Sequence, residues 1–323
     1  MQYIRPIKTL VIGGAGFIGS HLTPHLLESG RIVTIFSRSE SIKQKDLENL
    51  KIIKGDVIDV LFLNKIIKDY DEVVHLAYSG VPNTSHKTPL GDLTDNLNPV
   101  IQLMQLCAER GIKLILISSG GAVYGQSQCA PISESHPLYP ISPYGVIKLA
   151  MESYARMYRA TNNLDYICIR PSNPYGEGQR PYLGQGFIAT AIASIFDNKP
   201  IQVFGAAGTI RDYIYVDDLC AGIVAAMNYG RSGDTYNIGT GVGRSNLQVL
   251  DSLKPLFQSR NIKISIEFLP PRVFDVEKNI LDSTALKEIS GWMPQTLFED
   301  GIHRMINFLG QSPCKENNYQ ETP

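Results

Sequence analysis

One short segment near the amino terminus, GGAGFIG at residues 13–19, restricts the fold of this chain more than any other. It joins a β-branched run at 9–12 to an apolar segment at 17–28 that has the spacing of a helix. Glycines at 13, 16 and 19 allow a tight turn, a close backbone approach to a phosphate, and close packing of helix on strand. The free N–H groups at the helix start would then face the phosphates. The sequence therefore predicts a dinucleotide site that includes Gly13, Gly16, Phe17 and Ile18.

Short β-branched runs alternate with helix-like segments through the first half of the chain. The runs lie at 9–12, 32–36, 51–54, 72–76, 113–117 and 166–169, and long helices are expected at 93–110 and 144–161. Alternation at this rhythm predicts an α/β fold, a Rossmann-type doubly wound parallel sheet.

The rhythm breaks after Arg170, because residues 171–186 hold four Gly and three Pro. We therefore expect residues 1–170 to form a dinucleotide-binding domain, with return segments at about 211–240. Residues 171–210 and 241–310 are expected to form a smaller α+β substrate-binding portion, and 311–323 a flexible tail.

Composition excludes several classes of function. Among 323 residues, 30 Lys and Arg balance 31 Asp and Glu, so the net charge of −1 argues against a nucleic-acid or anionic-membrane partner. No apolar run reaches ~18 residues, so no membrane span is expected. Five scattered cysteines without metal-site spacing indicate reduced thiols in a cytoplasmic protein. His21 and His25 lie one helical turn apart but lack a third ligand, so no metal site is expected.

Other cofactor contacts are expected at the ends of the next strands. The position after the second strand usually carries an acid for the adenosine ribose. Here that position holds Ser37, followed by Arg38, whose guanidinium could pair with a 2′-phosphate. The cofactor is therefore NAD or NADP, with a slight preference for NADP. Further expected contacts are Asp56, Val57, Leu76 and Ala77.

Tyr144 and Lys148 are spaced so that a phenol and an ammonium share one face of a helix. A tyrosine with an ordinary pKa of about 10 is a poor base near neutrality. A neighbouring ammonium and an oxidised nicotinamide both favour the phenolate. A tyrosine in that setting can remove a proton from an alcohol while hydride leaves the same carbon. Lys148 could also bind the nicotinamide ribose.

These motifs resemble the extended short-chain dehydrogenases/reductases, in particular the UDP-glucose 4-epimerase branch of the NAD-dependent epimerase/dehydratase family. The resemblance covers residues 8–309. The segments that carry it are GGAGFIGS at 13–20, GD at 55–56, HLA at 75–77, SSGGAVYG at 118–125, SPYGVIK at 142–148, RPSNPYG at 170–176, RDYIYVDD at 211–218, PPRVFDVEKNILD at 270–282 and GWMP at 291–294.

The resemblance implies roles at the matched positions. Tyr144 would be the general base and acid, and Lys148 its partner. Asn173 would contact the nucleotide diphosphate or a ribose, and Arg211 and Arg272 would bind the diphosphate. Asp275 would orient Arg272 or meet a ribose hydroxyl. Relatives also pair two long helices into a dimer, which here would be those at about 92–110 and 144–161.

One position departs from the family pattern. The third catalytic group of the family is a Ser or Thr four residues before the tyrosine of the V-Y-G turn, and that position holds Gly120. Either a shifted loop lets Ser119 serve, which we favour, or a water replaces the hydroxyl. Dehydratase relatives place acids directly after this hydroxyl, whereas this chain has Gly121 and Ala122. That difference favours chemistry confined to C4 of a sugar.

The substrate side is less specific. Ser79 belongs to the segment 77–82, which is expected to face the hexose, and Tyr78 in it replaces a small residue of relatives. Asn279 lies seven residues after Arg272, where the epimerase branch limits the room around the sugar C2 substituent. Its intermediate size allows a free hydroxyl or an N-acetyl group.

The resulting expectation is a nucleotide-sugar 4-epimerase, acting on a UDP-hexose through a transient 4-keto sugar and a tightly bound NAD(P). One alternative is a 4-reductase or 4-dehydrogenase with exchanging NADP(H). Another is a non-catalytic dinucleotide sensor, which the glycine at position 120 allows but which would not need Tyr144, Lys148 and the arginines together.

Overall fold

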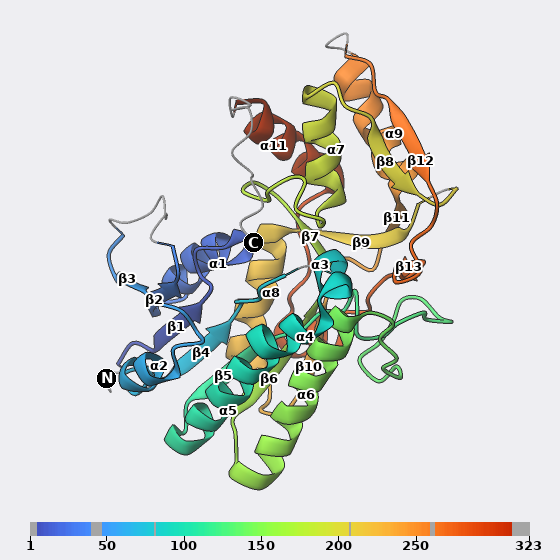
Figure 1. Cartoon of the computed structure of the whole chain (residues 1–323). Coiled ribbons are helices and arrows are strands. Elements are labelled where there is room, and N and C mark those ends of the chain that lie inside the picture. The colour runs from blue at the N-terminus through green and yellow to red at the C-terminus, as the bar shows by residue number, and fades with distance from the viewer. Residues whose placement is uncertain (1–4, 40–46, 81, 207, 259–261, 312–323) are drawn as a thin grey trace.

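The computed structural model describes residues 5–39, 47–80, 82–206, 208–258 and 262–311, and it has the expected α/β architecture (Figure 1). Its centre is a seven-stranded sheet, ordered β10-β6-β5-β4-β1-β2-β3, in which all neighbouring strands are parallel. The strands are β1 (Lys8–Ile12), β2 (Ile32–Ser37), β3 (Leu50–Lys54), β4 (Glu72–His75), β5 (Lys113–Ile117), β6 (Tyr166–Pro171) and β10 (Thr235–Ile238).

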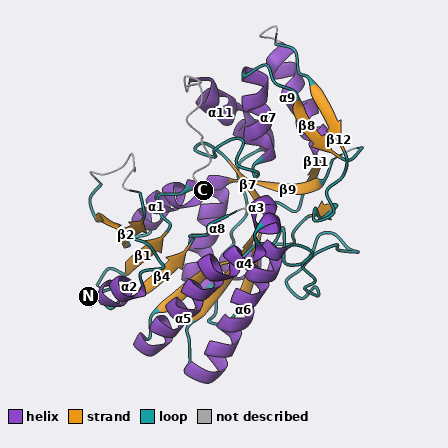
Figure 2. Ribbon diagram, in the orientation of Figure 1, coloured by secondary structure: helices purple, strands orange, loops and turns teal. Residues whose placement is uncertain are grey.

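Helices cover both faces of this sheet (Figure 2), because most of its strands are apolar on both sides. One face packs against α1 (Phe17–Glu28), α8 (Val216–Tyr229) and α10 (Thr284–Ser290). The other packs against α2 (Val60–Ile67), α5 (Asn98–Arg110) and α6 (Pro143–Asn162). The strand order reverses between β1 and β4, and ligands of open α/β sheets bind in the crevice outside the carboxyl ends at such a point.

A smaller portion lies beyond those carboxyl ends (Figure 1). Strand β9 pairs with β7, β11 and β13, and a separate parallel pair joins β8 to β12. Helices α7, α9 and α11 share a core with Tyr175, Tyr213 and Tyr215. The bounds are β7 (Asn173–Tyr175), α7 (Phe187–Phe196), β8 (Ile201–Phe204), β9 (Ile210–Tyr215), β11 (Gly243–Ser245), α9 (Asn246–Gln258), β12 (Ile266–Leu269), β13 (Lys278–Asn279) and α11 (Phe298–Gln311).

Two expectations about the elements need correction. The helix expected at 93–110 starts earlier and is not regular: α3 (Pro82–Lys87) and α4 (Pro89–Asp92) lead into a π-helical segment, η1 (Leu93–Leu97), and then into α5. Helix α10 falls in the range assigned to the substrate portion, but it packs against α8 and β10 of the large sheet. The expected flexible tail, beyond Gln311, lies outside the described residues.

The structure also bears on membrane association. Among the described residues, no helix is both long enough and apolar enough to cross a bilayer.

Candidate active site

Two cavities adjoin at the carboxyl edge of the large sheet. The glycine-turn cavity, of about 690 Å³, lies beside the turn between β1 and α1. The large cavity, of about 1190 Å³, extends from α6 to the smaller portion. They share a wall formed by Gly13, Gly16, Phe17, Leu76, Tyr78, Gln179 and Gln185.

The turn after β1 has the geometry of an anion site. Gly13 has φ +83°, and a Cβ there would lie 2.7 Å from the backbone nitrogen of Ala77, so only glycine fits. Gly16 is the N-cap of α1, and no side chain caps the first turn. The N–H groups of that turn are therefore left for a ligand, and the helix dipole favours a negative one. These residues fit a dinucleotide pyrophosphate.

The predicted adenosine contacts also come together. Ser37, Arg38, Asp56 and Val57 all line the glycine-turn cavity, as does Ala77. The Ser37 hydroxyl accepts a hydrogen bond from the backbone of Ser39, and Arg38 is exposed at the rim. This end of the cavity therefore offers a hydroxyl and a guanidinium, where many dinucleotide sites offer an acid.

Helix α6 positions the predicted catalytic pair. Ser142 caps the helix by accepting a 3.2 Å hydrogen bond from the Gly145 backbone, and Pro143 opens the first turn. Tyr144 therefore enters the large cavity at the helix start, with Lys148 one turn on and also lining it. Lys148 is 4% exposed, and its Nζ donates a 2.9 Å hydrogen bond to the carbonyl of Ile117, at the end of β5.

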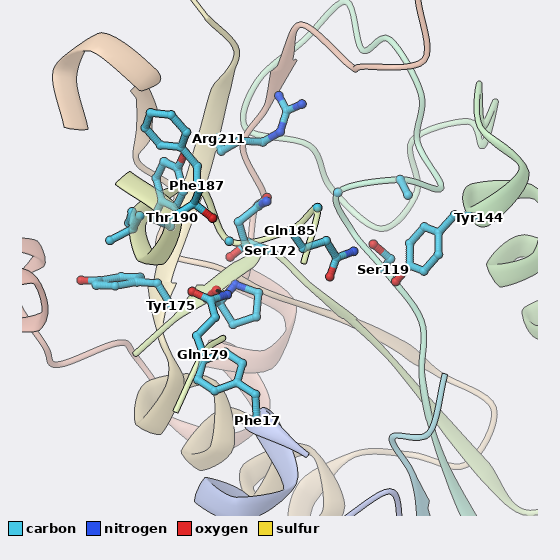
Figure 3. Close-up of a pocket in the computed structure, with 18 of the residues that line it drawn as sticks. Phe17, Ser119, Tyr144, Ser172, Tyr175, Gln179, Gln185, Phe187, Thr190 and Arg211 are labelled. Atoms are coloured by element: carbon cyan, nitrogen blue, oxygen red, sulfur yellow. Dashed lines mark hydrogen bonds between the residues drawn. The ribbon is translucent and has the colours of Figure 1, made fainter. Parts of the chain in front are cut away.

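Ser119 completes this group. Its hydroxyl lies near the Tyr144 phenol and opposes the effect of burial, which raises the pKa of that phenol. Figure 3 shows the two side chains together at one end of the pocket, with Phe187 and Thr190 at the other. Position 120 could not supply a hydroxyl here, because Gly120 is buried and a Cβ on it would overlap the Leu281 side chain. The structure therefore places Ser119, not position 120, beside the tyrosine.

Burial shapes the proton chemistry of the pair. It raises the pKa of Tyr144 to about 12, and the hydrogen bond with Ser119 opposes this shift. Burial also lowers the pKa of Lys148 to about 8, against the attraction of nearby carboxylates, including Asp92 and Glu152. Without a ligand the phenol is therefore a proton donor. A positive charge beside it, such as an oxidised nicotinamide, would favour the phenolate.

The predicted diphosphate residues line the other part of the large cavity: Asn173, Arg211, Arg272 and Asp275. The Arg272 guanidinium stacks on Phe204, 3.6 Å from the ring centroid, and its Nε lies 3.8 Å from Asp275. Asn173 has a buried Oδ1 with no hydrogen-bond partner among the described residues. The two cations suit a phosphorylated ligand, and the open acceptor suits a hydroxyl group of the same ligand.

Two predicted substrate residues lie elsewhere. Asn279 is 1% exposed and lines neither cavity; its Nδ2 donates a 2.9 Å hydrogen bond to the Gly120 carbonyl, so it supports the loop behind the cavity wall. Ser79 lines the glycine-turn cavity rather than the large one, and its backbone N–H and hydroxyl both donate to Asn96.

Sequence reasoning missed several residues of the site. Gln179 and Gln185 line both cavities, but their segment showed only the composition of a loop. Asp92 and Asn96 are buried behind Tyr78, on helical turns whose irregularity has no sequence signal.

His21 and His25, the two histidines one helical turn apart, both lie near Asp217. Among the described residues, no group of three His, Cys, Asp or Glu side chains is arranged to hold a metal ion. His21 instead contacts Asp217 and the carbonyl of Glu177. His75, at the end of β4, is buried, which lowers its pKa to about 3 and keeps it neutral.

Comparison with known proteins identifies the family. The NAD dependent epimerase/dehydratase family matches residues 9–239. The chain belongs to this family.

Full-length relatives carry more than one activity. A UDP-glucose 4-epimerase of Mycolicibacterium smegmatis is 32% identical over 311 residues, which cover 94% of this chain and 98% of the relative. A dTDP-4-dehydro-6-deoxyglucose reductase of Escherichia coli is also 32% identical, with the same two coverages. Among solved structures, UDP-glucose 4-epimerase of Thermotoga maritima with UDP-glucose is similar, with a TM-score of 0.86, 32% identity, and coverage of 94% of this chain and 99% of that one.

Proposed function

We propose that this protein is a nucleotide-sugar 4-epimerase that inverts C4 of a UDP-hexose. One observation carries the proposal: Tyr144, beside Ser119 and one turn from Lys148, lines the large cavity, which also holds Arg211 and Arg272 and shares a wall with the glycine-turn cavity. A base placed there can reach both a cofactor and a sugar anchored by its diphosphate.

The residues of the chain have distinct tasks in this reaction. A bound NAD supplies the acceptor and later the donor of the C4 hydride. Tyr144 takes the proton of the 4-hydroxyl, and Ser119 hydrogen-bonds the same oxygen. Lys148 holds a positive charge near the phenolate and donates to the nicotinamide ribose. After the 4-keto sugar has turned its other face to the cofactor, Tyr144 returns the proton.

Retention of the keto sugar depends on the remote part of the substrate. Arg211, Arg272 and Asn173 are assigned to the diphosphate and its ribose, so the intermediate stays bound while the hexose rotates. This use of remote binding energy keeps a reactive species in the site. Burial lowers the pKa of Arg211, so a diphosphate would also compensate a charge that is costly to bury.

The choice of NAD follows the family description. Arg38, exposed at the adenosine end of the glycine-turn cavity, favours the 2′-phosphate of NADP. A retained NAD in the purified protein would support the proposal, whereas Arg38→Ala weakening NADP binding alone would favour the phosphorylated cofactor.

Elimination of water is a less suitable reaction for this site. Gly121 and Ala122 line the large cavity where dehydratase relatives are expected to place acids. Asp92, whose charge reaches Tyr144, lines neither cavity and already accepts hydrogen bonds from Tyr78 and Asn96. Of the described acids, Asp275 does line the large cavity, but it lies beside Arg272. Positions 121 and 122 therefore offer no acid to assist loss of a hydroxyl.

The test is a panel of UDP-, dTDP- and GDP-hexoses, with and without an N-acetyl group at C2, followed by product NMR. We expect inversion at C4 with no net consumption of cofactor, and loss of inversion in Tyr144→Phe. Stoichiometric oxidation of NADPH would instead establish the reductase. Absence of any conversion, with a dinucleotide still bound, would favour a sensor.

We also propose a homodimer formed through α5 and α6. These two helices pack side by side, and Val146, Tyr154 and Met157 form an exposed apolar stripe along α6. Light scattering should give the mass of a dimer for the wild type and of a monomer for the double variant Tyr154→Lys/Met157→Lys. The same substitution at the exposed Tyr229, on α8, is the control.

A further inference from the structure

Lys148 is a buried cation with little direct support from the chain. Its Nζ donates to the carbonyl of Ile117, but no carboxylate of the described residues lies within ion-pair distance of it. The buried Arg31 and Arg170, by contrast, each pair with a glutamate at 2.6 Å. An ammonium without a counter-ion in such a place tends to lose its proton.

The ring of Tyr78 supplies a contact that compensates for this. Lys148 Nζ lies 4.4 Å from the centroid of the Tyr78 ring, which is within cation–π distance, and 5.8 Å from that of Tyr144. Tyr78 also meets Tyr144 edge to face, with 4.9 Å between the centroids and 73° between the ring planes. One ring therefore touches both members of the catalytic pair.

Asp92 fixes the orientation of this ring. The Tyr78 hydroxyl donates a 3.0 Å hydrogen bond to Asp92 Oδ2, and the carboxylate is 5% exposed. Asp92 also accepts from the Ser85 hydroxyl and, at 2.8 Å, from Asn96 Nδ2. A buried carboxylate that is hydrogen-bonded this fully has little freedom to move, and neither has the phenol that it holds.

The helix behind the site is irregular where these contacts arise. Asp92 ends α4 and Asn96 lies within the π-helical segment η1, and both side chains reach the 78–79 segment. Single π turns inside α-helices are rare and often occur at functional sites. The irregular backbone therefore serves a specific arrangement of side chains around Tyr78.

The charge of Asp92 favours the protonated form of both Lys148 and Tyr144. It favours the ammonium, so it opposes the effect of burial, which lowers the pKa of Lys148 to about 8. It also disfavours the phenolate, and it adds to the burial that raises the pKa of Tyr144. Protonation of the lysine near neutrality is therefore sensitive to what surrounds it.

We infer that Tyr78, held by Asp92, is a positioning residue of the catalytic pair. Its ring face supports the Lys148 ammonium, and its contact with Tyr144 fixes the angle of the phenol. This role rests on the proposed function, because it matters only if the phenol and ammonium handle a substrate proton.

The test compares Tyr78→Leu, which removes the ring, with Tyr78→Phe, which keeps it. A desolvated cation–π contact is worth about tenfold in an equilibrium, so we expect kcat of Tyr78→Leu to fall about tenfold with KM within about twofold. In Tyr78→Phe most of kcat should return. Tyr229→Leu, an exposed tyrosine at the end of α8, is the matched control and should leave kcat unchanged.

A second measurement does not depend on turnover. Lysine labelled with ¹³C at Cε, with the Lys148 signal assigned through Lys148→Met, reports the titration of this ammonium by NMR. In Tyr78→Leu its midpoint should fall by about one pH unit, and in Tyr78→Phe by much less. If the wild type converts no sugar while this shift is seen, the proposed function fails but the contact stands.

Several outcomes would overturn the inference. Unchanged kcat and an unchanged Lys148 midpoint in Tyr78→Leu would show that the ring does not act on the pair. A rise in KM alone would make Tyr78 a substrate contact. Equal losses in the Leu and Phe variants would assign the effect to the hydroxyl. If Tyr78→Leu does not fold, Tyr78→Met removes the same ring, and unchanged Lys148 titration there counts against the proposal.

Discussion

Two buried polar clusters lie one helical turn apart on α6, and they differ in whether the chain supplies a counter-charge. Lys148 faces the cavities, hydrogen-bonds a backbone carbonyl, and has a pKa lowered by burial. Glu152 faces Arg170 on β6 at 2.6 Å, with both side chains at most 3% exposed. Burial alone would lower the pKa of Arg170, but the hydrogen bond and charge of Glu152 outweigh it and raise the pKa.

Two consecutive serines show the same contrast. The Ser118 hydroxyl donates a 2.5 Å hydrogen bond to Glu152 Oε1 and belongs to the paired cluster of Glu152 and Arg170. The next residue, Ser119, contacts Tyr144 and belongs to the catalytic cluster with Lys148. The paired cluster has its charges matched by the chain itself. In the catalytic cluster a bound ligand would have to supply the opposite charge. A buried charge without an opposite charge from the chain is therefore the feature that indicates the site.

The largest expected effect is on turnover in the catalytic cluster. Tyr144→Phe removes the proton donor and acceptor but keeps the ring that packs against Tyr78. Because general acid–base groups contribute about 10²–10⁴-fold, we expect kcat to fall by roughly 10³-fold. The melting temperature should change little. A variant that retains more than a tenth of wild-type kcat would contradict this assignment.

The next effect is on stability in the paired cluster. Glu152→Gln leaves the Arg170 guanidinium buried without its counter-charge, and breaking such a pair costs about 3–5 kcal/mol. We expect the free energy of unfolding, measured with urea, to fall by about that amount. The exposed Glu109→Gln, which removes a charge from a surface pair with Arg110, is the control and should cost less than about 1 kcal/mol.

Substitution of the two serines should separate the clusters within one loop. Ser119→Ala removes the hydroxyl beside the Tyr144 phenol, so we expect kcat to fall about 10–100-fold with little loss of stability. Ser118→Ala removes a buried hydrogen bond to a charged group and should cost about 1.5–3 kcal/mol of stability with most of kcat retained. Reversal of the two phenotypes would mean that the loop has another conformation in solution.

The parts of this molecule that sequence predicted are those set by local spacing. The glycines of the β1–α1 turn, the alternation of strands and helices, and the Tyr144–Lys148 pair depend on residues that are near neighbours in the chain. Each has a short-range physical cause: a left-handed φ, strand or helix periodicity, or a shared helix face.

The parts that sequence could not predict depend on contacts between distant segments. Leu281 leaves no room for a side chain at position 120. The carbonyl of Gly120 accepts a hydrogen bond from Asn279, 159 residues away. The resemblance to the epimerase branch implied that Asn279 limits the room around the sugar C2 substituent. Nothing local in the sequence shows that Asn279 turns behind the cavity wall. The hydrogen bond between Tyr78 and Asp92 could not be predicted from the sequence either, because it depends on the π-helical segment η1, which no residue type specifies.

A third polar cluster, around His21, links α1 of the large-sheet portion to the loop after β7. Substitution in this cluster should give the smallest change in stability of those predicted. His21, on α1, approaches Asp217 at 2.7 Å through Nδ1 and the carbonyl of Glu177 at 2.8 Å through Nε2. Both partners are acceptors, so only the doubly protonated imidazole satisfies both. Burial lowers the pKa of His21, but the hydrogen bonds to Asp217 and Glu177 outweigh it and raise the pKa above 6.5.

The sign of the pH dependence follows from that direction. A raised folded-state pKa means that the stabilisation is fully present below pH 6.5 and is lost as the pH rises through the folded-state value. Asp217 stays ionised throughout, because the hydrogen bond from His21 outweighs burial and lowers its pKa. His25 lies 3.7 Å from the same carboxylate, and Tyr215 donates to the Glu177 carboxylate.

We therefore expect wild type and His21→Gln to differ most in unfolding free energy below pH 6.5, by about 1 kcal/mol, and to converge as the pH rises. His136→Gln is the control. The His136 ring faces the Pro137 carbonyl through Nδ1 and the Ser127 hydroxyl through Nε2, and neither partner is a carboxylate. A difference between wild type and His21→Gln that stays constant from pH 5 to pH 9 would show that His21 does not hold the added proton. Of the three clusters compared, only the pair of Glu152 and Arg170 would then have its buried charges neutralised by residues of the chain itself.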